Sequence, residues 1–364
     1  MAVAPPAPSN SLGNAIPLPV SGLAPAGPVR VEVPAAAAPT SPATAGQTAR
    51  AIVELGKPGI TRLVTITALV GFVLAAVARP LAAWQQGGWG AITLTLAACV
   101  VGTVLSSGGA NAINQWMERH RDALMKRTAR RPLPQGRLTA GSALWAGLAM
   151  SIGGIVILAA FCGPAAAAVS LATILVYVLL YTPAKVLTPL NTILGAVPGA
   201  LPPLIGWCAA QFPVLGWAHS FDALTQPGGW SLFALMFVWQ IPHFLSLAWM
   251  YREDYAAGGY RMLPVVDADG SLTARTMLGW AIMLIPATLL PVLLLRGGAH
   301  IGWPYAAVAV LSGLAFIAVV VPFARSRQPL AARRVFLASI MHLPLLMVAL
   351  VIEALTRWLL QAAA

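Results

Sequence analysis

Residues 90–112 read GAITLTLAACVVGTVLSSGGANA, a run without a single charged side chain. A helix that crosses a bilayer needs about 20 mainly apolar residues, so this stretch predicts a transmembrane helix. Comparable runs recur, and we expect an all-α integral membrane protein with about nine transmembrane helices in a single bundle. The nine lie near residues 60–79, 90–112, 140–161, 164–183, 190–211, 230–250, 276–295, 303–323 and 336–358. The fifth carries Pro198, Pro202 and Pro203, and we expect it to be kinked or broken.

The composition of the 364-residue chain excludes several classes of protein. Hydrophobic residues make up 59% and charged residues only 9%, whereas soluble globular chains carry about 25% charged residues. This excludes an ordinary soluble enzyme, a disordered protein and a fibre, and makes the lipid bilayer the expected partner. The formal charge of +12 is compatible with nucleic-acid binding. However, the basic residues lie between apolar segments, where membrane topology explains them, so we predict no nucleic-acid partner. Cys99, Cys162 and Cys208 lack metal-binding spacing, and we expect them to be buried.

The first 48 residues differ from the rest of the chain. They contain many alanines, many of the prolines and few charges, a composition that cannot bury a core. We predict a disordered Ala/Pro-rich tail over residues 1–48 and one polytopic membrane domain over residues 49–364. No basic segment leads into a clean apolar run, so the tail is not read as a signal peptide.

The basic residues are distributed unevenly between the two sides of the membrane. With the N-terminus inside, all but three of the 22 Lys and Arg side chains fall on the inner side, the exceptions being Arg79, Arg296 and Arg357. Because cytoplasmic connections are enriched in Lys and Arg, we predict a cytoplasmic N-terminus and an external C-terminus. The tail lacks the Arg- and Ser-rich character of a transit peptide, which favours a bacterial inner membrane.

Carboxylates are scarce, and two of them follow the second predicted helix. Asn114, Glu118 and Asp122 are spaced i, i+4 and i+8, which places them on one face of a helix. Oxygen-bearing side chains suit a hard cation, and Mg2+ prefers one or two carboxylates completed by water and phosphate oxygens. Basic residues follow in the same connection, as a site for an anion such as a diphosphate requires. The alternative is a solvated helix end beside an ordinary positive cytoplasmic loop.

A second charged group follows the sixth predicted helix, at the same side of the membrane. Asp254 is a candidate for a further metal ligand and Arg252 for a phosphate contact. Helix capping and anchoring by interfacial aromatics explain this group more simply when it is considered alone. Two such groups on the same face favour a shared site.

Other polar residues lie within or beside the apolar segments. His243 lies inside the sixth predicted helix, where an ionisable group is costly, so a function and an interhelical hydrogen bond are both open. Lys185 ends the fourth helix, either as a site residue or as a snorkelling anchor. We expect His342 to serve packing, and Glu353 and Arg357 to form a local i, i+4 pair.

Together these residues resemble the motifs of the UbiA-type intramembrane prenyltransferases, and most closely the branch of that family that farnesylates heme. The resemblance covers about residues 50–360. It rests on residues 57–61, 114–122, 125–128, 131–133, 181–191, 195–207, 239–244, 254–255 and 262–264. The chain departs from the family pattern at Glu118, where Asp is commoner, and at His120, where an acid is frequent. It also departs at Gly59 and Val186, where Arg is common.

The resemblance implies a UbiA-like bundle, a Mg2+-dependent prenyl transfer and a set of site residues. The implied metal ligands are Asn114, Glu118, Asp122 and Asp254. The implied contacts to the diphosphate of farnesyl diphosphate are Arg127, Arg131, Lys126, Lys185, Lys57 and Arg252. The implied contacts to the acceptor, heme b, are His243, Asn191 and Tyr181. Addition of the farnesyl group and of water to a heme vinyl group would give heme O for heme–copper oxidases. A heme A synthase or an oxidase-assembly protein is the partner class that this suggests.

Two other functions stay open at this point. Another UbiA-type aromatic prenyltransferase would act on a quinone precursor instead of heme. A transporter would place polar residues near the bilayer midplane on broken helices. Here the acids lie at one face of the membrane and only the fifth helix is expected to be broken, which argues against transport.

Overall fold

The computed structural model describes residues 44–79, 88–295 and 300–363, and these residues form helices and turns without a strand. The first helix, α1 (Ala45–Leu55), begins inside the predicted tail. Thr44 caps it, because its hydroxyl accepts from the Gln47 N–H while the Gln47 side chain accepts from the Thr44 N–H. The rest of that predicted tail, residues 1–43, lies outside the described residues.

Eight helical segments of the described residues are long and apolar enough to cross a membrane. They are α2 (Pro58–Val77), α4 (Trp89–Asp122), α5 (Ala140–Leu175) with η1 (Val176–Tyr181) and α6 (Thr182–Leu187), α7 (Asn191–Ala200) with α8 (Pro202–Leu215), α9 (Pro227–Met250), α12 (Ser271–Leu294), α13 (Trp303–Ser326) and α14 (Pro329–Ala363). Short helices η2 (Ser220–Thr225), α10 (Arg252–Ala257) and α11 (Leu263–Val266) occupy connections. The expectation of an all-α membrane protein is confirmed.

The difference from the nine predicted spans arises at one residue. Residues 140–187 make up one of the eight segments, but two helices meet within it at a kink, between the predicted helices 140–161 and 164–183. Gly163 has a non-helical backbone (φ 85°, ψ 164°), and Pro164 follows it. Proline has no N–H and clashes with the preceding turn, and the chain reverses direction here. The Phe161 carbonyl accepts from Thr95 near the start of α4, whereas Tyr177 and Thr182 bond to Asn114 near its end. The Ala165 N–H donates to Ser220 Oγ at 3.2 Å, which satisfies one of the freed groups.

The predicted break in the proline-rich helix is confirmed. α7 ends at Ala200, and α8 begins with Pro202 and Pro203. The following turn of α8 packs directly on α2, since a Cβ added to Gly206 would lie 1.7 Å from the Ala68 carbonyl oxygen. Only glycine permits this close approach of two backbones. The contact fixes α2 and α8 as one wall of the bundle.

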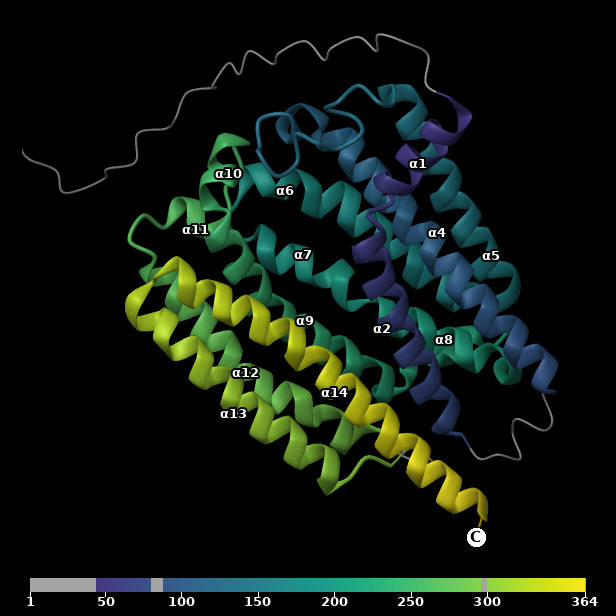
Figure 1. Ribbon diagram of the computed structural model, residues 1–364. Helices are drawn as coiled ribbons and strands as arrows, with labels where there is room; N and C mark the ends of the chain where they lie inside the picture. The colour runs from purple at the N-terminus through teal and green to yellow at the C-terminus, as the bar shows by residue number, and fades with distance from the viewer. Residues whose placement is uncertain (1–43, 80–87, 296–299, 364) are drawn as a thin grey trace, which may run out of the picture. The chain divides into compact units, whose positions relative to one another are not determined.

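Two groups of helices face each other across the described part of the chain (Figure 1). α4 packs on α5, and α2 packs on α8, while α9, α12, α13 and α14 pack on one another; α7 lies against α9 and η1. The short helices α1, α6, α10 and α11 all lie at one end, at the top of Figure 1. Large apolar side chains such as Ile152, Leu311 and Leu345 are exposed on the outer surface, as lipid contact requires.

The predictions for the three cysteines, for His342 and for the Glu353–Arg357 pair are confirmed. Cys99, Cys162 and Cys208 are buried free thiols. His342 is buried and stacks on Phe316 at 5.4 Å between ring centroids. Glu353 and Arg357 form the expected pair at 2.9 Å. Glu353 also accepts the N–H groups of Gly302 and Tyr305, so it ties the start of α13 to α14.

Candidate active site

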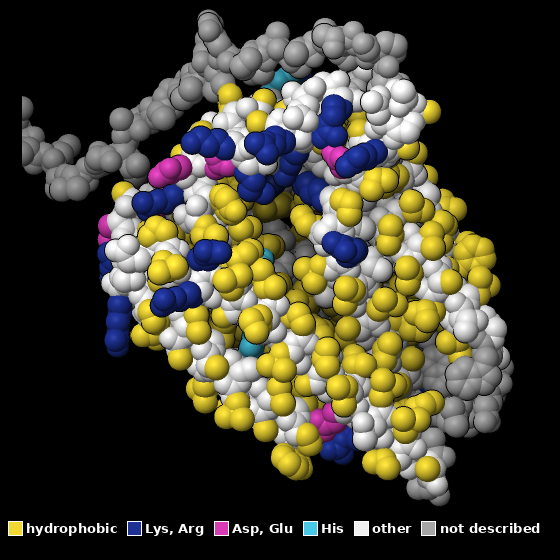
Figure 2. All heavy atoms as spheres, in the orientation of Figure 1, with side chains coloured by type: hydrophobic (Ala, Val, Ile, Leu, Met, Phe, Trp, Pro, Cys, Tyr) yellow, Lys and Arg dark blue, Asp and Glu magenta, His cyan; other side chains and the backbone are white. Residues whose placement is uncertain are grey.

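A cavity of about 400 Å³ opens between the two groups of helices. Figure 2 shows this hollow beneath the end of the molecule where Lys and Arg side chains gather, with mainly hydrophobic side chains around it. The charged residues that line it are Lys57, Glu118, Asp122, Arg127, Arg131 and Lys185. Most of the other lining residues are apolar, aromatic or small, with Asn111, Gln240 and His243 as the larger polar exceptions. The cavity therefore has a charged mouth and a largely apolar interior.

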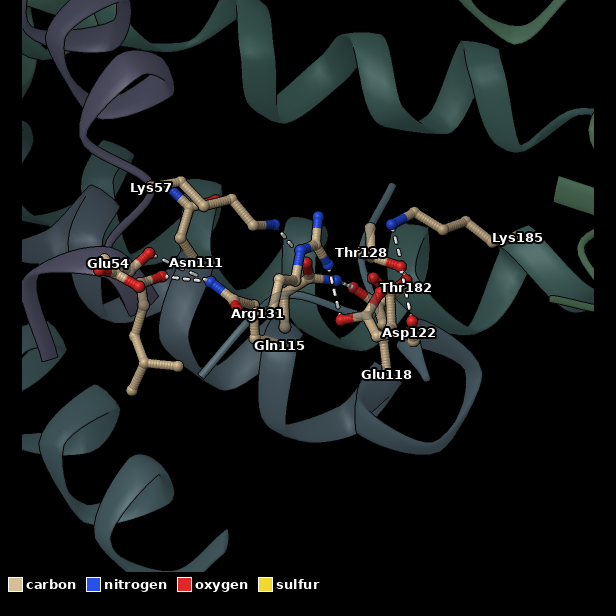
Figure 3. Close-up of polar contacts among 12 residues, drawn as sticks. Glu54, Lys57, Asn111, Gln115, Glu118, Asp122, Thr128, Arg131, Thr182 and Lys185 are labelled. Atoms are coloured by element: carbon tan, nitrogen blue, oxygen red, sulfur yellow. Dashed lines mark hydrogen bonds and ion pairs between the residues drawn. The ribbon is translucent and has the colours of Figure 1, made fainter. Parts of the chain in front are cut away.

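The predicted acidic face of α4 forms one side of this mouth. Asn114, Glu118 and Asp122 are 0%, 6% and 2% exposed, and a side-chain cation from another segment reaches each of them (Figure 3). The three contacts are Lys57 Nζ to Asn114 Oδ1 at 2.8 Å, Lys185 Nζ to Glu118 Oε1 at 2.7 Å and Arg131 NH1 to Asp122 Oδ2 at 2.6 Å. The structure thus gathers six of the predicted site residues, from residue 57, residues 114–131 and residue 185, at one place.

Lys57 enters the site through an unusual backbone. It has a left-handed conformation (φ 48°, ψ 69°) and precedes Pro58, the first residue of α2. Proline disfavours the helical region for the residue before it, which leaves Lys57 outside the helix with its side chain pointing to α4. Burial lowers the pKa of Lys57 to about 7, and the nearby cations Arg131 and Lys185 act in the same direction.

Lys185 comes from α6, immediately after the π-helical segment η1. Its Nζ lies 4.6 Å from the centre of the Tyr181 ring and 5.9 Å from that of Tyr260, distances at which aromatic faces attract a cation. Burial raises the pKa of Tyr260, so this phenol stays protonated and can donate a hydrogen bond to an anion. Tyr181, a predicted acceptor contact, also lines the cavity.

Asp254 belongs to α10, and its side chain contacts the connection between α4 and α5. Its two carboxylate oxygens accept the backbone N–H groups of Lys126 and Arg127, each at 3.1 Å. The guanidinium of Arg127 lies 5.4 Å from the Tyr251 ring centre and 5.8 Å from that of Tyr255. Asp254 therefore holds the connection that delivers Arg127 to the cavity, and it is not itself among the residues of the cavity wall.

Four more of the predicted residues are not part of that wall, namely Asn114, Lys126, Arg252 and Asn191. Lys126 and Arg252 are exposed, and the guanidinium of Arg252 lies 4.6 Å from the Trp249 ring centre. Asn191 is fully buried and donates to the backbone carbonyls of Thr188 and Arg261. These bonds give Asn191 the role of joining the start of α7 to the segment after α10.

Sequence reasoning missed several residues of the cavity. Tyr177 OH lies 3.3 Å from the side-chain oxygens of Asn111 and Asn114, and Asn114 donates to Thr182 at 3.0 Å. Asn111 precedes Asn114 by three residues, so extending the polar face of α4 by one turn would have found it. Nothing in the sequence indicates that Tyr177, 66 residues from Asn111, closes the same network.

The α4 face has the chemistry of a hard-cation site. Each of Glu118 and Asp122 places one oxygen in an ion pair and keeps the other outside it, and both residues line the cavity. No group of three or more His, Cys, Asp or Glu side chains comes together in the described ranges. A Mg2+ ion here would take its other ligands from water and a phosphate, which is the coordination that Mg2+ prefers. The residues fit such an ion.

These features define a class of protein: an integral membrane bundle whose cavity has a mouth lined by four basic and two acidic side chains and a mainly apolar interior. The UbiA prenyltransferase family model matches residues 64–343. The chain belongs to the UbiA prenyltransferase family, and it is a prenyltransferase.

Curated relatives agree over most of the chain. A protein named protoheme IX farnesyltransferase from Opitutus terrae is 42% identical over 303 residues, which cover 83% of this chain and 94% of that protein. One of the same name from Solibacter usitatus is 42% identical over 298 residues, or 82% and 96% of the two chains. The mitochondrial protein of that name from Arabidopsis thaliana is 35% identical, over 84% of this chain and 65% of its own length.

Solved structures share the fold at low sequence identity. A structure reported for digeranylgeranylglyceryl phosphate synthase in membranes has a TM-score of 0.65 and 14% identity, and covers 85% of this chain and 99% of that one. A UbiA homolog from Archaeoglobus fulgidus bound to DMAPP and Mg2+ has a TM-score of 0.56 and 11% identity, over 82% and 98% of the two chains. At such identities the likeness supports the fold alone.

Proposed function

We propose that this prenyltransferase transfers the farnesyl group of farnesyl diphosphate to a vinyl group of heme b, with addition of water, to make heme O for heme–copper oxidases. The observation that carries the proposal is the cavity with a cationic mouth and an apolar interior. Its charged end would suit a diphosphate, and its mainly apolar lining would suit the apolar parts of the two substrates. The relatives named protoheme IX farnesyltransferase, about 40% identical over most of the chain, supply the choice of substrates.

The diphosphate would lie at the mouth. Lys57, Arg127, Arg131 and Lys185 line it, and the planar guanidinium groups of the two arginines can each hold two phosphate oxygens. Lys185 and Arg131 are already oriented by Glu118 and Asp122. When the C1–O bond of the substrate breaks, these cations stabilise the negative charge that develops on the diphosphate. Lys126 and Arg252 stay predicted contacts to the diphosphate, although neither is among the residues that line the cavity.

Mg2+ would be held at the face of α4. Asn114, Glu118 and Asp122 would be its ligands, and Asp254 stays the predicted further ligand from the second acidic group. A bound Mg2+ polarises the phosphate oxygens and neutralises charge on the leaving group. A UbiA homolog of the same fold binds DMAPP and Mg2+, which supports the metal requirement. This chain's own residues would orient the diphosphate.

Heme b would occupy the wall formed by α9 and α14. Trp239, His243, Phe244 and Phe336 line this side of the cavity, and such aromatic faces suit a flat porphyrin. Tyr181 lies nearer the mouth, and Asn191 would act through the backbone that it holds. A bacterial inner membrane with the charged mouth at the cytoplasmic face agrees with the distribution of Lys and Arg. A heme A synthase or an oxidase-assembly protein would receive the product.

Activity of the purified protein in lipid tests the proposal. Supplied with heme b, farnesyl diphosphate and Mg2+, the protein should form a hydroxyfarnesylated heme, detected by mass spectrometry. EDTA should abolish the product and excess Mg2+ should restore it. The residues of the α4 face alone do not complete the coordination of Mg2+, which leaves the ion open to chelation. Transfer to a quinone precursor with no heme product would assign the protein to another aromatic prenyltransferase branch of the UbiA family. Full turnover in EDTA would reject the metal assignment.

A further inference from the structure

The ring of His243 is held on three sides. Trp239 stacks on one face, with ring centroids 4.9 Å apart and 18° between planes, and Phe336 lies at 5.0 Å and 24°. Nδ1 lies 2.8 Å from Ser339 Oγ. The remaining edge of the ring carries Nε2. Nε2 has no hydrogen-bond partner among the described residues. The atom keeps accessible surface, and His243 lines the cavity.

The hydrogen bonds of Ser339 determine which nitrogen of His243 carries the proton. Ser339 Oγ donates to the Phe336 carbonyl oxygen at 2.6 Å, and a hydroxyl has only one proton to donate. Towards His243 this oxygen can therefore only accept, so Nδ1 is the protonated nitrogen. Neutral imidazole carries one N–H, and Nε2 is left with its lone pair directed to the cavity.

We propose that His243 Nε2 is the base that accepts a proton from the water added to the heme vinyl group, and that Ser339 is the positioning residue that fixes its tautomer. The proposal rests on the proposed function. Sequence position alone offers no reason to connect Ser339 with this step, since it lies 96 residues from His243. The connection appears only when α14 packs on α9.

The proposed step forms one C–C bond and one C–O bond on the vinyl group. The C1–O bond of farnesyl diphosphate breaks and its electron pair leaves with the diphosphate. The π pair of the vinyl group forms the new C–C bond, which leaves a cation on the carbon attached to the porphyrin. A lone pair of water forms the C–O bond, and one water proton passes to Nε2 and later to solvent. Without a base for the water, the cation loses a proton from the neighbouring carbon, and the product lacks the elements of water.

The test measures the ratio of hydroxylated to dehydrated farnesyl-heme made by the full-length protein in lipid. Ser339→Ala should lower this ratio about a hundredfold, the usual contribution of a positioned base, and Ser339→Thr should restore it. His243→Gln should lower it as much or more. Trp239 Nε1 also donates to the Ser339 carbonyl, a bond that the alanine variant keeps. Because both products contain the farnesyl group, the ratio separates this step from substrate binding and folding.

Ser246→Ala is the matched control. Ser246 is buried one turn along the same helix, and its hydroxyl donates to the His243 backbone carbonyl at 2.7 Å without touching the ring. Its product ratio should equal that of wild type. A ratio unchanged in Ser339→Ala and His243→Gln, whatever their yield, overturns the inference. An absorption band of heme iron bound to imidazole that disappears in His243→Gln would also overturn the inference, because the Nε2 lone pair would then bind the iron. A wild-type protein that transfers no farnesyl to heme would overturn the proposed function itself.

Discussion

Individual charged residues at the mouth are held in ion pairs. Four cations and two carboxylates line the cavity, and the Lys185–Glu118 pair is nearly buried, with side chains 12% and 7% exposed. Such a pair gives little net stability, because removing both charges from water offsets their attraction. Its value is positional: the cation is already fixed where a diphosphate would arrive.

Replacement of Lys185 by methionine tests this at the residue scale. Lys185→Met leaves Glu118 buried without its partner, and we expect a loss of about 3 kcal/mol or more in the free energy of unfolding. Adding Glu118→Gln should recover much of that loss while activity stays absent. Thermal unfolding in detergent measures both variants. Arg50→Met, which removes an exposed partner of Glu54, should leave the unfolding temperature unchanged. Equal unfolding temperatures for Lys185→Met and wild type would contradict the pairing.

Helices were predictable where their ends or breaks follow from local chemistry. Proline marked the division between α7 and α8, and apolar length marked the spans. The kink at Gly163 falls in the predicted gap between two helices, whereas the partner of its freed backbone group was not predictable. A freed backbone group can be satisfied by a distant side chain, here that of Ser220 on η2, and a local pattern contains no information about that partner.

The bend gives a prediction at the scale of the element. Gly163→Ala would force a side chain into positive φ and place its Cβ 2.4 Å from the Phe212 ring. We expect a loss of about 2 kcal/mol in the free energy of unfolding, since this backbone region is adopted almost only by glycine and costs other residues about 1–3 kcal/mol before any clash. Gly153→Ala is the matched control in the same helix, where no atom lies within 4 Å of the added Cβ. It should be neutral or slightly stabilising. Similar unfolding temperatures for the two variants would show that the bend tolerates a side chain.

Across the described residues, the composition of the site was more predictable than its assembly. The spacing of Asn114, Glu118 and Asp122 placed them on one helix face, and the structure confirms that face. The partners Lys57 and Lys185 had been named as candidates, but their pairing with particular α4 residues depends on how helices rotate against one another. Asp254 and Asn191 show the limit most clearly: both carry polar groups that bind backbone here, and only packing determines which polar groups face a cavity.

The orientation in the membrane is a prediction for the whole chain. The loop between α4 and α5 should face the cytoplasm, and the connection between α8 and α9 should face outward. Gln135→Cys and Ala218→Cys place exposed thiols in these two connections, and the native cysteines are buried, so background labelling should be low. In intact spheroplasts a membrane-impermeant maleimide should label only Ala218→Cys, because Gln135 lies behind the bilayer with most of the Lys and Arg residues. Permeabilised spheroplasts, in which both should react, control for accessibility. Labelling of Gln135→Cys alone before permeabilisation would invert the topology and place the charged mouth, with its predicted diphosphate site, outside the cell.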